Sequence, residues 1–322
     1  MVEIIRLQAD VPLEMSGDRL DQVAAHLFSD YSRSRLQTWI KQGSLLVDGQ
    51  VCRPRDKVKA GAVLSINAEP EQEVSWQAQD IDLDIVYEDD SIIVVNKPAG
   101  LVVHPAAGHS DGTLVNALLN HAPEMEQLPR GGIVHRLDRE TSGIMVAART
   151  LQAHAHLVEQ LQARTVKRQY CAVCIGTMTG GGTIDAPMGR HPKHRKKMAV
   201  LTHGGKPAVT HYRVVQRFGH HTQIAVNLET GRTHQIRVHM AHRHYPLVGD
   251  PAYGGRPRIP RGASQALIEA LRGFPRQALH AESLGLIHPR SGDAMQFDCP
   301  LPEDMENLLA ILADEDPPER GG

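Results

Sequence analysis

The chain of 322 residues has few aromatic residues, few cysteines, almost no net charge and no long apolar stretch. With aromatics at 4%, its hydrophobic cores must be built from Val, Leu, Ile and Ala, which the hydrophobic content of 41% can supply. The longest apolar stretches are a few residues each, far below the ~20 that a membrane helix needs. We therefore expect no membrane-spanning segment and no association with a membrane.

The N-terminus and the cysteines lack the features of secreted proteins. Residues 1–7 contain no apolar core region and no small-residue cleavage site, so they do not predict a signal peptide. The four cysteines, at positions 52, 171, 174 and 299, are irregularly spaced and do not predict a disulfide framework. Both features favour a reducing, cytoplasmic compartment.

The net charge of −2 excludes a protein that binds nucleic acid over its whole surface, because such a protein would be strongly basic. Contact with nucleic acid must therefore use local basic patches, and residues 190–197 and 256–261 form two of them. The first patch suits RNA phosphates if it is an exposed loop between strands, although a solvated hairpin tip would have a similar composition. Its five basic residues are Arg190, Lys193, Arg195, Lys196 and Lys197.

Residues 17–67 predict a small unit of two helices followed by a small sheet. Asp18 and Ser32 or Ser34 are candidate caps for helices with apolar spacing, and Gly43 stands where the second helix would end. Asp48-Gly49 predicts a type I′ hairpin turn, which needs positive φ at both central residues. Candidate RNA contacts in this unit are Arg19, Arg33, Arg35 and Lys41.

The chain on either side of this unit divides into four further parts. We expect an N-terminal segment at 1–16, a polar linker at 68–80, a second domain at 81–313 and a disordered tail at 314–322. The second domain shows no strict alternation of strands and helices, which favours an α+β fold with a mixed, mostly antiparallel sheet and flanking helices. Helices are expected at 112–119 and 151–161, and strands at 91–96, 170–175, 208–215, 222–228 and 235–239.

A dense polar loop at 135–143 lies between two apolar runs of the second domain. Thr141 and Ser142 suit the local hydrogen bonds that such a loop needs. Asp138 lies at its centre, between Arg136 and Arg139. On its own, an aspartate between arginines is more often half of a structural ion pair than a catalytic group.

The loop reads His135-Arg136-Leu137-Asp138-Arg139-Glu140-Thr141-Ser142-Gly143 and resembles the active-site segment of the RluA family of pseudouridine synthases, His-Arg-Leu-Asp-x-x-Thr-Ser-Gly. Further segments are similar to motifs of this family and occur in the family's order. Residues 17–67 likewise resemble the S4 RNA-binding domain. The resemblance covers residues 10 to 305, and the further motif segments are 96–105, 167–170, 229–239, 246–250 and 277–281.

The resemblance implies a role for each motif residue. Asp138 would be the catalytic carboxylate, acting as nucleophile or as base, and Arg237 would be its ion-pair partner. Tyr170 would stack on the uracil and take part in proton transfer, because a phenol has a flat apolar face and an O–H. Residues implied to contact the base or the RNA are His135, Arg136, which would fill the space left by the extruded base, and Leu279.

The reaction that the resemblance implies needs no cofactor. Pseudouridine forms from uridine when the C–N glycosidic bond breaks, the uracil rotates, and a C–C bond forms to the same sugar. Nothing is hydrolysed and no electrons are transferred, so we expect neither a metal nor a redox cofactor. The implied partner is 23S (large-subunit) ribosomal RNA or a pre-50S particle, and the implied enzyme is a monomer.

Other interpretations of the chain remain open at this stage. A synthase for transfer RNA or another ribosomal site would use the same chemistry, and a non-catalytic S4-type ribosome-binding protein would use none. A glycoside hydrolase would need a second carboxylate ~5–9.5 Å away and usually has aromatic sugar platforms, which are scarce here.

Two further patterns invite a metal or redox interpretation. The histidines 234, 239, 242 and 244 are clustered, but no Cys or acidic ligand joins them at zinc-site spacing. Cys171 and Cys174 fall in an expected strand, where residues three apart face opposite sides, so a shared metal or disulfide is not expected.

Overall fold

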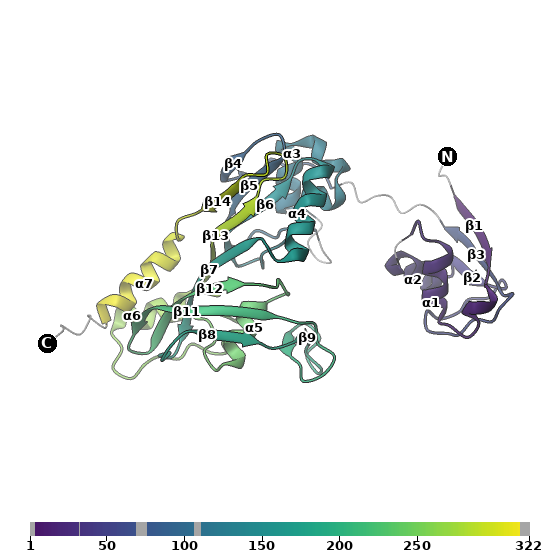
Figure 1. Ribbon diagram of the computed structural model, residues 1–322. Coiled ribbons are helices and arrows are strands. Elements are labelled where there is room, and N and C mark those ends of the chain that lie inside the picture. Colours follow the sequence, from purple (N-terminus) through teal and green to yellow (C-terminus); the bar gives the residue numbers. More distant parts are fainter. Residues whose placement is uncertain (1–3, 32, 69–75, 106–110, 316–322) are drawn as a thin grey trace. The chain divides into compact units, whose positions relative to one another are not determined.

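The computed structural model describes residues 4–31, 33–68, 76–105 and 111–315, and these form two compact units (Figure 1). The first unit is Met1–Ser75 and the second is Trp76–Gly322. Within the described residues, no helix is long and apolar enough to cross a membrane.

The first unit is a three-stranded antiparallel sheet packed with two helices. Strand β3 lies in the middle, between β1 and β2, and its partners are all antiparallel. Leu20, Leu36 and Ile40 are fully buried in a core of their own. The elements are β1 (Ile5–Asp10), a 3-10 turn (Leu13–Met15), α1 (Leu20–Leu27), α2 (Arg33–Gln42), β2 (Leu45–Val47) and β3 (Val63–Ala68).

The sequence suggested a separate N-terminal segment at 1–16, but the described residues of this stretch, 4–16, belong to the first unit. Ile5–Asp10 forms the edge strand β1 and pairs along its whole length with β3, from Ile5 opposite Ala68 to Asp10 opposite Val63. This strand was missed because its residues are mostly exposed, and an exposed edge strand shows little apolar alternation.

Two local signals in the first unit were interpreted correctly. Asp48 and Gly49 have φ of 50° and 75°, and the N–H of Gln50 donates to the carbonyl of Val47, as a type I′ turn requires. Gly43 follows α2 with φ of 78°. Helix α1 begins at Leu20 with Arg19 rather than Asp18 at its cap, and Ser32 lies outside the described residues.

The second unit is built on one nine-stranded sheet. Its order is β4-β5-β6-β13-β7-β12-β11-β8, with β14 paired to β13, and β13–β6 is the one parallel pair among its described strands. The expected α+β class and the mixed, mostly antiparallel sheet are therefore confirmed. The strands are β4 (Ile85–Glu88), β5 (Ile92–Lys97), β6 (Ser142–Ala148), β7 (Lys167–Ile175), β8 (Gly182–Asp185), β11 (Val209–Phe218), β12 (His221–Leu228), β13 (Leu279–Ile287) and β14 (Ala294–Asp298), with β9 (Met188–Arg190) and β10 (Met198–Val200) forming a separate hairpin.

Helices flank this sheet at both ends. Helix α4 packs on β6, α5 lies against β10 and β11, and α6 and α7 pack on each other (Figure 1). The described helices are α3 (Leu114–His121), α4 (Leu151–Ala163), α5 (Gln235–His242), α6 (Gln265–Gly273) and α7 (Glu303–Glu315), with 3-10 turns at Pro123–Gln127 and Pro129–Gly132.

The expected strand at 235–239 is wrong, because these residues begin helix α5. Ile236, Val238 and Met240 alternate with polar residues, which imitates a strand. All residues from 235 to 240 are buried, so the helix has no solvent face that would reveal its own period.

The expected linker and tail also differ from the structure. Trp76 packs edge-on against His104, and the carbonyl of Gln77 accepts from Asn116, so residues 76–80 are docked on the second unit. Residues 69–75 lie outside the described residues. Helix α7 continues to Glu315, two residues into the expected tail, and 316–322 lie outside the described part.

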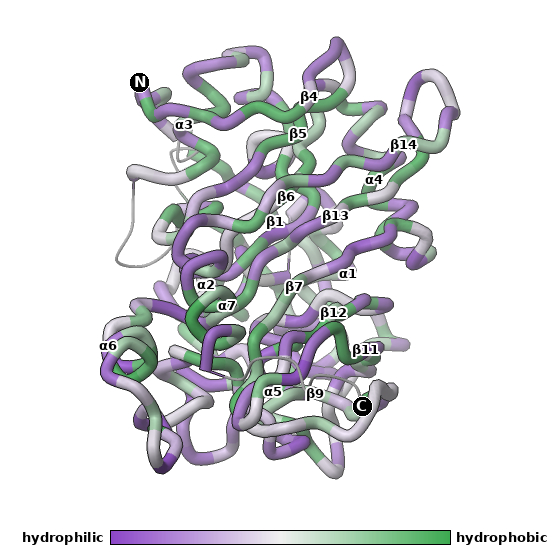
Figure 2. The backbone as a smooth tube through the Cα atoms, turned by 90° about the vertical axis from the view of Figure 1, so that its left-hand side faces the viewer, coloured by the Kyte–Doolittle hydropathy of each residue, from purple (hydrophilic) through white to green (hydrophobic). Residues whose placement is uncertain are grey.

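The core of the second unit follows the central strands. Figure 2 shows green, hydrophobic stretches along β5 and β7. Cys171 and Cys174 on β7 belong to two different core clusters, on opposite faces of the sheet, as the strand period predicted. Both thiols are free, and burial raises their pKa.

Candidate active site

A cavity of about 870 Å³ opens on the sheet of the second unit. This volume falls in the range of small-molecule and cofactor sites, ~300–1,000 Å³. Its lining comes from the polar loop before β6, from α4, from β7, from the loop that leads into α5, and from the start of β13. The lining includes residues 133–138 and 228–237 with Val103, His104, Arg130, Val158, Leu161, Arg164, Arg168, Tyr170 and Leu279.

Asp138 projects into this cavity from a loop that is held at several points. The N–H of Thr141 donates to the carbonyl of Asp138 over 3.0 Å, which closes a turn. Lys97 Nζ donates to the carbonyls of Pro98, Leu101 and Arg139, at 2.7, 3.0 and 3.0 Å, so it ties the loop to the end of β5. Burial lowers the pKa of Lys97 to about 7, and nearby Glu140 and Asp138 oppose that shift.

A second anchor comes from the segment that leads into β13. Arg276 is buried, forms two hydrogen bonds with Asp304 at 2.6 and 2.8 Å, and donates to the carbonyl of Glu140 at 3.2 Å. Gln277 donates to the hydroxyl of Thr141 at 3.1 Å. The hydroxyl of Ser142 lies 3.0 Å from Nδ1 of His280. The expected local hydrogen bonds of the Thr141 and Ser142 side chains are therefore wrong, because both hydroxyls have partners far along the chain.

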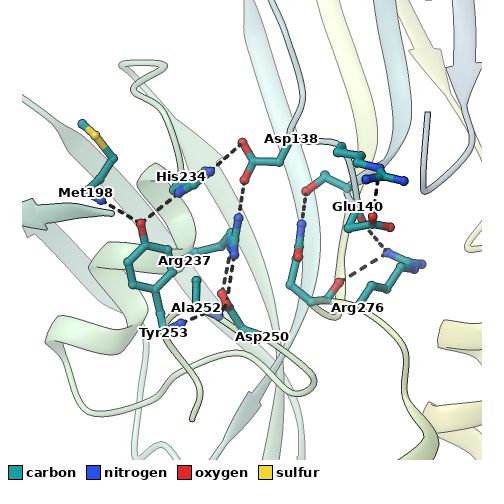
Figure 3. A network of polar contacts seen from close by, with 12 residues as sticks. Asp138, Glu140, Met198, His234, Arg237, Asp250, Ala252, Tyr253 and Arg276 are labelled. Carbon is teal, nitrogen blue, oxygen red and sulfur yellow. Dashed lines mark hydrogen bonds and ion pairs between the residues drawn. The ribbon is translucent and has the colours of Figure 1, made fainter. Parts of the chain in front are cut away.

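Arg237 links Asp138 to a second, fully buried carboxylate (Figure 3). Its Nη1 donates to Asp138 over 3.0 Å, while Nε and Nη2 donate to Asp250 over 2.8 and 2.9 Å. Burial opposes the charge on Arg237, but the two carboxylates raise the pKa of the guanidinium above its ordinary value. Asp250 also accepts from the N–H groups of Ala252 and Tyr253, which fixes its position.

His234 lies beside Asp138 and makes a long contact with it, which is an ion pair only when the ring is protonated. Its Nε2 is 3.9 Å from Asp138, too far for a hydrogen bond, and Nδ1 is 2.8 Å from the hydroxyl of Tyr253. Burial is the main cause that lowers the pKa of His234, which favours a neutral ring. Figure 3 shows this chain of contacts continuing to the N–H of Met198.

Tyr170 and Leu279 form an apolar part of the cavity wall. Both are buried, with 7% and 4% of their surface exposed, and they lie on the neighbouring strands β7 and β13. Burial raises the pKa of Tyr170, so its hydroxyl is protonated at neutral pH. Asp138, Arg237, Tyr170 and Leu279, which are distant in sequence, therefore line one cavity.

His135 and Arg136 precede Asp138 and have different surroundings. Nε2 of His135 accepts from the N–H of Val146 over 3.1 Å, and burial with a nearby Arg168 lowers the pKa of the ring to about 3. His135 is thus a neutral residue bound to the β6 backbone. Arg136 is exposed and lines the cavity.

Known proteins match the chain over nearly its whole length. Residues 91–242 match the RNA pseudouridylate synthase family, and residues 18–64 match the S4 domain. The chain is 62% identical over 312 residues to the ribosomal large subunit pseudouridine synthase D of Pseudomonas aeruginosa, covering 97% of both proteins. It is 55% identical over 313 residues to the protein of that name from Escherichia coli, covering 97% of this chain and 96% of that one.

The chain belongs to the RNA pseudouridylate synthase family. A solved structure of human RNA pseudouridylate synthase domain containing 4 agrees with this assignment, with a TM-score of 0.55 and 26% identity. It covers 71% of this chain and 92% of the human one. The resemblance drawn from the sequence motifs is confirmed.

The S4 domain of this synthase family member holds its candidate RNA contacts in two ways. Arg19 and Arg33 both pair with the buried Asp21, at 3.0 and 2.8 Å, and keep 41% and 47% of their side-chain surface exposed. Arg35 lies over the rings of Tyr31 and Trp39, 5.7 and 5.2 Å from their centroids. Lys41 is exposed in the last turn of α2.

The basic patch of the synthase unit lies on the loop between β9 and β10. Lys193, Arg195 and Lys196 are exposed there. Arg190 donates to the carbonyl of Arg195 over 3.0 Å. Lys197 turns inward instead, donating to the carbonyl of Ala252 over 2.6 Å above the Tyr253 ring.

Two of the clustered histidines of the synthase unit, His234 and His239, have hydrogen-bond partners. His239 is buried, and its two nitrogens lie 2.8 Å from Thr210 Oγ1 and 3.0 Å from the carbonyl of Ala186. Within the described ranges, no three His, Cys, Asp or Glu side chains are grouped as metal ligands would be.

No functional role was predicted from the sequence for Asp250, which binds Arg237, or for His234 and Arg168, which line the cavity. Asp250 and His234 each fell within a motif segment, and a metal-binding role for His234 was not expected. Arg168 belongs to the motif segment 167–170, in which only Tyr170, two positions later, was given a role. Since side chains two apart on a strand share a face, the position of Arg168 could have been inferred.

Proposed function

We propose that this protein isomerises specific uridines to pseudouridine in large-subunit ribosomal RNA. The observation that carries the proposal is the Asp138–Arg237 pair, 3.0 Å apart, beside a wall formed by Tyr170 and Leu279 in one cavity. It places a carboxylate next to a flat apolar surface, which is what chemistry at a sugar–base junction requires.

The reaction can be written with the chain's own groups. Asp138 attacks the sugar or removes a proton from it, and the bond between C1′ and N1 breaks with its electron pair left on the uracil. The uracil rotates against Tyr170 and Leu279, and C5 bonds to C1′. As this bond forms, the bond between Asp138 and C1′ breaks, or Asp138 returns the proton that it removed from the sugar. The proton on C5 is then removed and N1 gains one, so atoms and electrons balance. Arg237 keeps Asp138 ionised and oriented.

The target uridine must leave its stack to reach Asp138, at a cost of a few kcal/mol. Arg136 is exposed at the cavity, next to Leu137 and Asp138. In our proposal its planar guanidinium occupies the space that the base vacates, where it can stack or form two hydrogen bonds. The S4 domain and the loop at 190–197 supply further phosphate contacts.

The choice of large-subunit ribosomal RNA rests on the relatives. Two proteins that share 62% and 55% identity with this chain are named for that substrate. We propose further that the enzyme acts as a monomer. We propose that the protein acts in the cytoplasm. A ribosomal RNA substrate and four free thiols both support this location.

Asp138→Asn tests the proposal, because it keeps the shape of the side chain and removes the charge. We expect pseudouridine to disappear from its sites while RNA binding stays within about twofold. The measurement is chemical mapping of pseudouridine in ribosomal and transfer RNA from cells that lack the protein, after add-back of wild type or Asp138→Asn.

Glu140→Gln is the matched control, since Glu140 lies on the same loop and forms an exposed pair with Arg139 at 3.3 Å. It should restore modification fully. If the pseudouridines that depend on this protein lie only in transfer RNA, the substrate is transfer RNA and not large-subunit ribosomal RNA. Restoration by Asp138→Asn would refute the enzyme and favour a non-catalytic binding protein.

A further inference from the structure

Arg168 is a buried cation that the proposed chemistry does not use. It lies on β7 two residues before Tyr170, so the two side chains share one face of the strand, and both line the cavity. Only 8% of Arg168 is exposed. It also lies close enough to lower the pKa of Tyr170, against the effect of burial.

The guanidinium of Arg168 is only partly satisfied. Its Nη2 donates weakly to the carbonyls of Leu228 and Glu229, over 3.4 and 3.2 Å. Its Nε is buried and has no hydrogen-bond partner. Nowhere in the described part of the chain does a carboxylate form an ion pair with it. Arg237, in the same cavity, has two carboxylates.

A buried charge without a counter-charge is costly, and proteins normally pair it. Burial lowers the pKa of Arg168, but an arginine side chain stays protonated at neutral pH. The positive charge therefore remains in the cavity wall uncompensated. A bound ligand that carries a negative charge would compensate the guanidinium and offset the cost of burying it.

The backbone beside Arg168 is shaped to admit the guanidinium. A Cβ on Gly231 would lie 2.7 Å from Nη1 of Arg168, so only glycine leaves the tip undisturbed. Gly231 belongs to the loop between β12 and α5, which carries Glu229 and Arg232 along the cavity. The loop thus closes over the guanidinium, while the carboxylate of Glu229 lies 3.4 Å from Arg164 and 2.6 Å from His211 and forms no ion pair with Arg168.

We propose that Arg168 binds an anionic oxygen of the target nucleotide. The proposal rests on the proposed function, because it assumes that a uridine of RNA enters this cavity. The oxygen has two possible sources with one chemistry. It belongs either to a phosphodiester next to the target uridine or to the uracil ring, which becomes an anion when the C1′–N1 bond breaks.

Arg168→Met tests the proposal by removing the charge while keeping an apolar stem. The substrate is a ribosomal RNA fragment in which the wild-type enzyme has been shown to form pseudouridine. We expect single-turnover kcat/KM to fall at least about 30-fold, as for loss of a buried charged contact. Arg168→Lys keeps the positive charge but not the planar guanidinium with its several N–H donors, so its kcat/KM should fall less.

Arg149→Met is the matched structural control. Arg149 is also largely buried, donates to the carbonyl of Asp89 over 3.0 Å, and lies outside the cavity lining. Its loss should lower the melting temperature without a comparable loss of rate. If Arg168→Met is too unstable to assay, Gly231→Ala displaces the same guanidinium and should also slow the reaction.

Methylphosphonate substitution identifies the source of the oxygen, because it neutralises one phosphate at a time. If a phosphate is bound, neutralising it raises the Kd of the Asp138→Asn protein but not that of the Asp138→Asn/Arg168→Met double variant. If the uracil anion is bound, Kd is unchanged by Arg168→Met, the rate alone falls, and phosphate neutralisation affects both proteins equally. Either pattern supports the proposal.

The proposal is overturned if Arg168→Met, or Gly231→Ala in its place, retains the rate and the Kd of wild type. It is equally overturned if the rate falls no more than in Arg149→Met at the same loss of stability. In both cases wild-type enzyme still forms pseudouridine, so the proposed function stands. Absence of pseudouridine with wild-type enzyme would instead refute the proposed function.

Discussion

Arg237 donates two hydrogen bonds to Asp250 but only one to Asp138. This difference suits the catalytic role that we propose for Asp138. Asp250 accepts two hydrogen bonds from the guanidinium and two from backbone N–H groups, and its side chain is fully buried. Asp138 accepts one hydrogen bond from Arg237 and keeps 18% of its side chain exposed. Asp250 therefore anchors the guanidinium, while Asp138 keeps an oxygen free to face the cavity.

Asp250→Asn should impair catalysis although the side chain of Asp250 does not contact the substrate. The amide cannot accept both guanidinium N–H groups as a carboxylate does, so Arg237 loses its anchor and Asp138 its fixed orientation. Breaking a buried ion pair costs about 3–5 kcal/mol of stability. We expect kcat to fall roughly 10–100-fold, as for loss of an orienting contact, with KM little changed.

Single-turnover kinetics and urea unfolding of the same preparations measure both effects. Asp90→Asn is the control, because Asp90 pairs with Arg290 at 3.2 Å on the surface, where both side chains are more than 70% exposed. Such a pair contributes ~0–1 kcal/mol. An Asp250→Asn enzyme with wild-type kcat would show that Arg237 needs no second carboxylate.

Individual residues of the cavity were predictable to different degrees. Asp138, Tyr170 and Leu279 could be selected because each belongs to a specific motif, and the structure brings them to one cavity. Asp250 and Arg168 could not be selected on charge alone. Asp250 matters because it binds Arg237, and Arg168 matters because no carboxylate pairs with it in the described part of the chain. Only the three-dimensional packing reveals these two facts.

At the scale of elements, the loop that carries Asp138 depends on the close approach of β6 and β13. Gly143 is part of this contact, since it pairs with Ala281 across the parallel pair and has φ of 116°. A Cβ at this position would lie 2.2 Å from the carbonyl oxygen of Ala281 and 2.6 Å from its nitrogen. Both are backbone atoms, so the strands themselves would have to separate.

Gly143→Ala should therefore destabilise the second unit by roughly 4 kcal/mol, the range of the most severe substitutions, and should abolish modification. Urea unfolding and pseudouridine mapping measure the two losses. Gly292→Ala is the control: its φ of 78° is also unfavourable, but nothing lies within 4 Å of its Cβ. It should cost about 1 kcal/mol. Equal losses in the two variants would contradict the argument.

Elements that are buried on all sides could be predicted only where their residue types favour one structure. The run Ile92–Val95 is β-branched and buried, and it is strand β5 as expected. The run from 235 to 242 is buried along its first six residues, so apolar alternation there indicated a strand where α5 stands. At β1, few residues are buried, and no apolar pattern exists to be recognised.

At the scale of the whole molecule, each of the two units has a hydrophobic core of its own. Val23, Leu36 and Leu64 belong to the cluster of the first unit, and Ile93, Val146 and Met240 belong to a cluster of the second. A unit with its own core can in principle unfold by itself. We therefore expect two transitions in a melting curve of the intact chain.

Asp21 offers a way to assign one of those transitions. Burial raises the pKa of its carboxyl, but hydrogen bonds from Arg33, Arg19 and Gln37 outweigh burial and lower the pKa to about 2. Since the folded pKa lies below the ordinary value of 3.8, this carboxylate stabilises the folded unit above about pH 4. The contribution disappears as the pH falls through 2.

Asp21→Asn in the full-length protein should lower one melting transition and leave the other unchanged. Loss of charged hydrogen bonds costs roughly 1.5–3 kcal/mol. In a domain of 60–100 residues, each kcal/mol shifts Tm by ~4–8 °C. Calorimetry at pH 6 should show the full shift between wild type and variant, and calorimetry near pH 2 a much smaller one. A shift of both transitions, or one that persists undiminished in acid, would contradict independent cores or the role of Asp21.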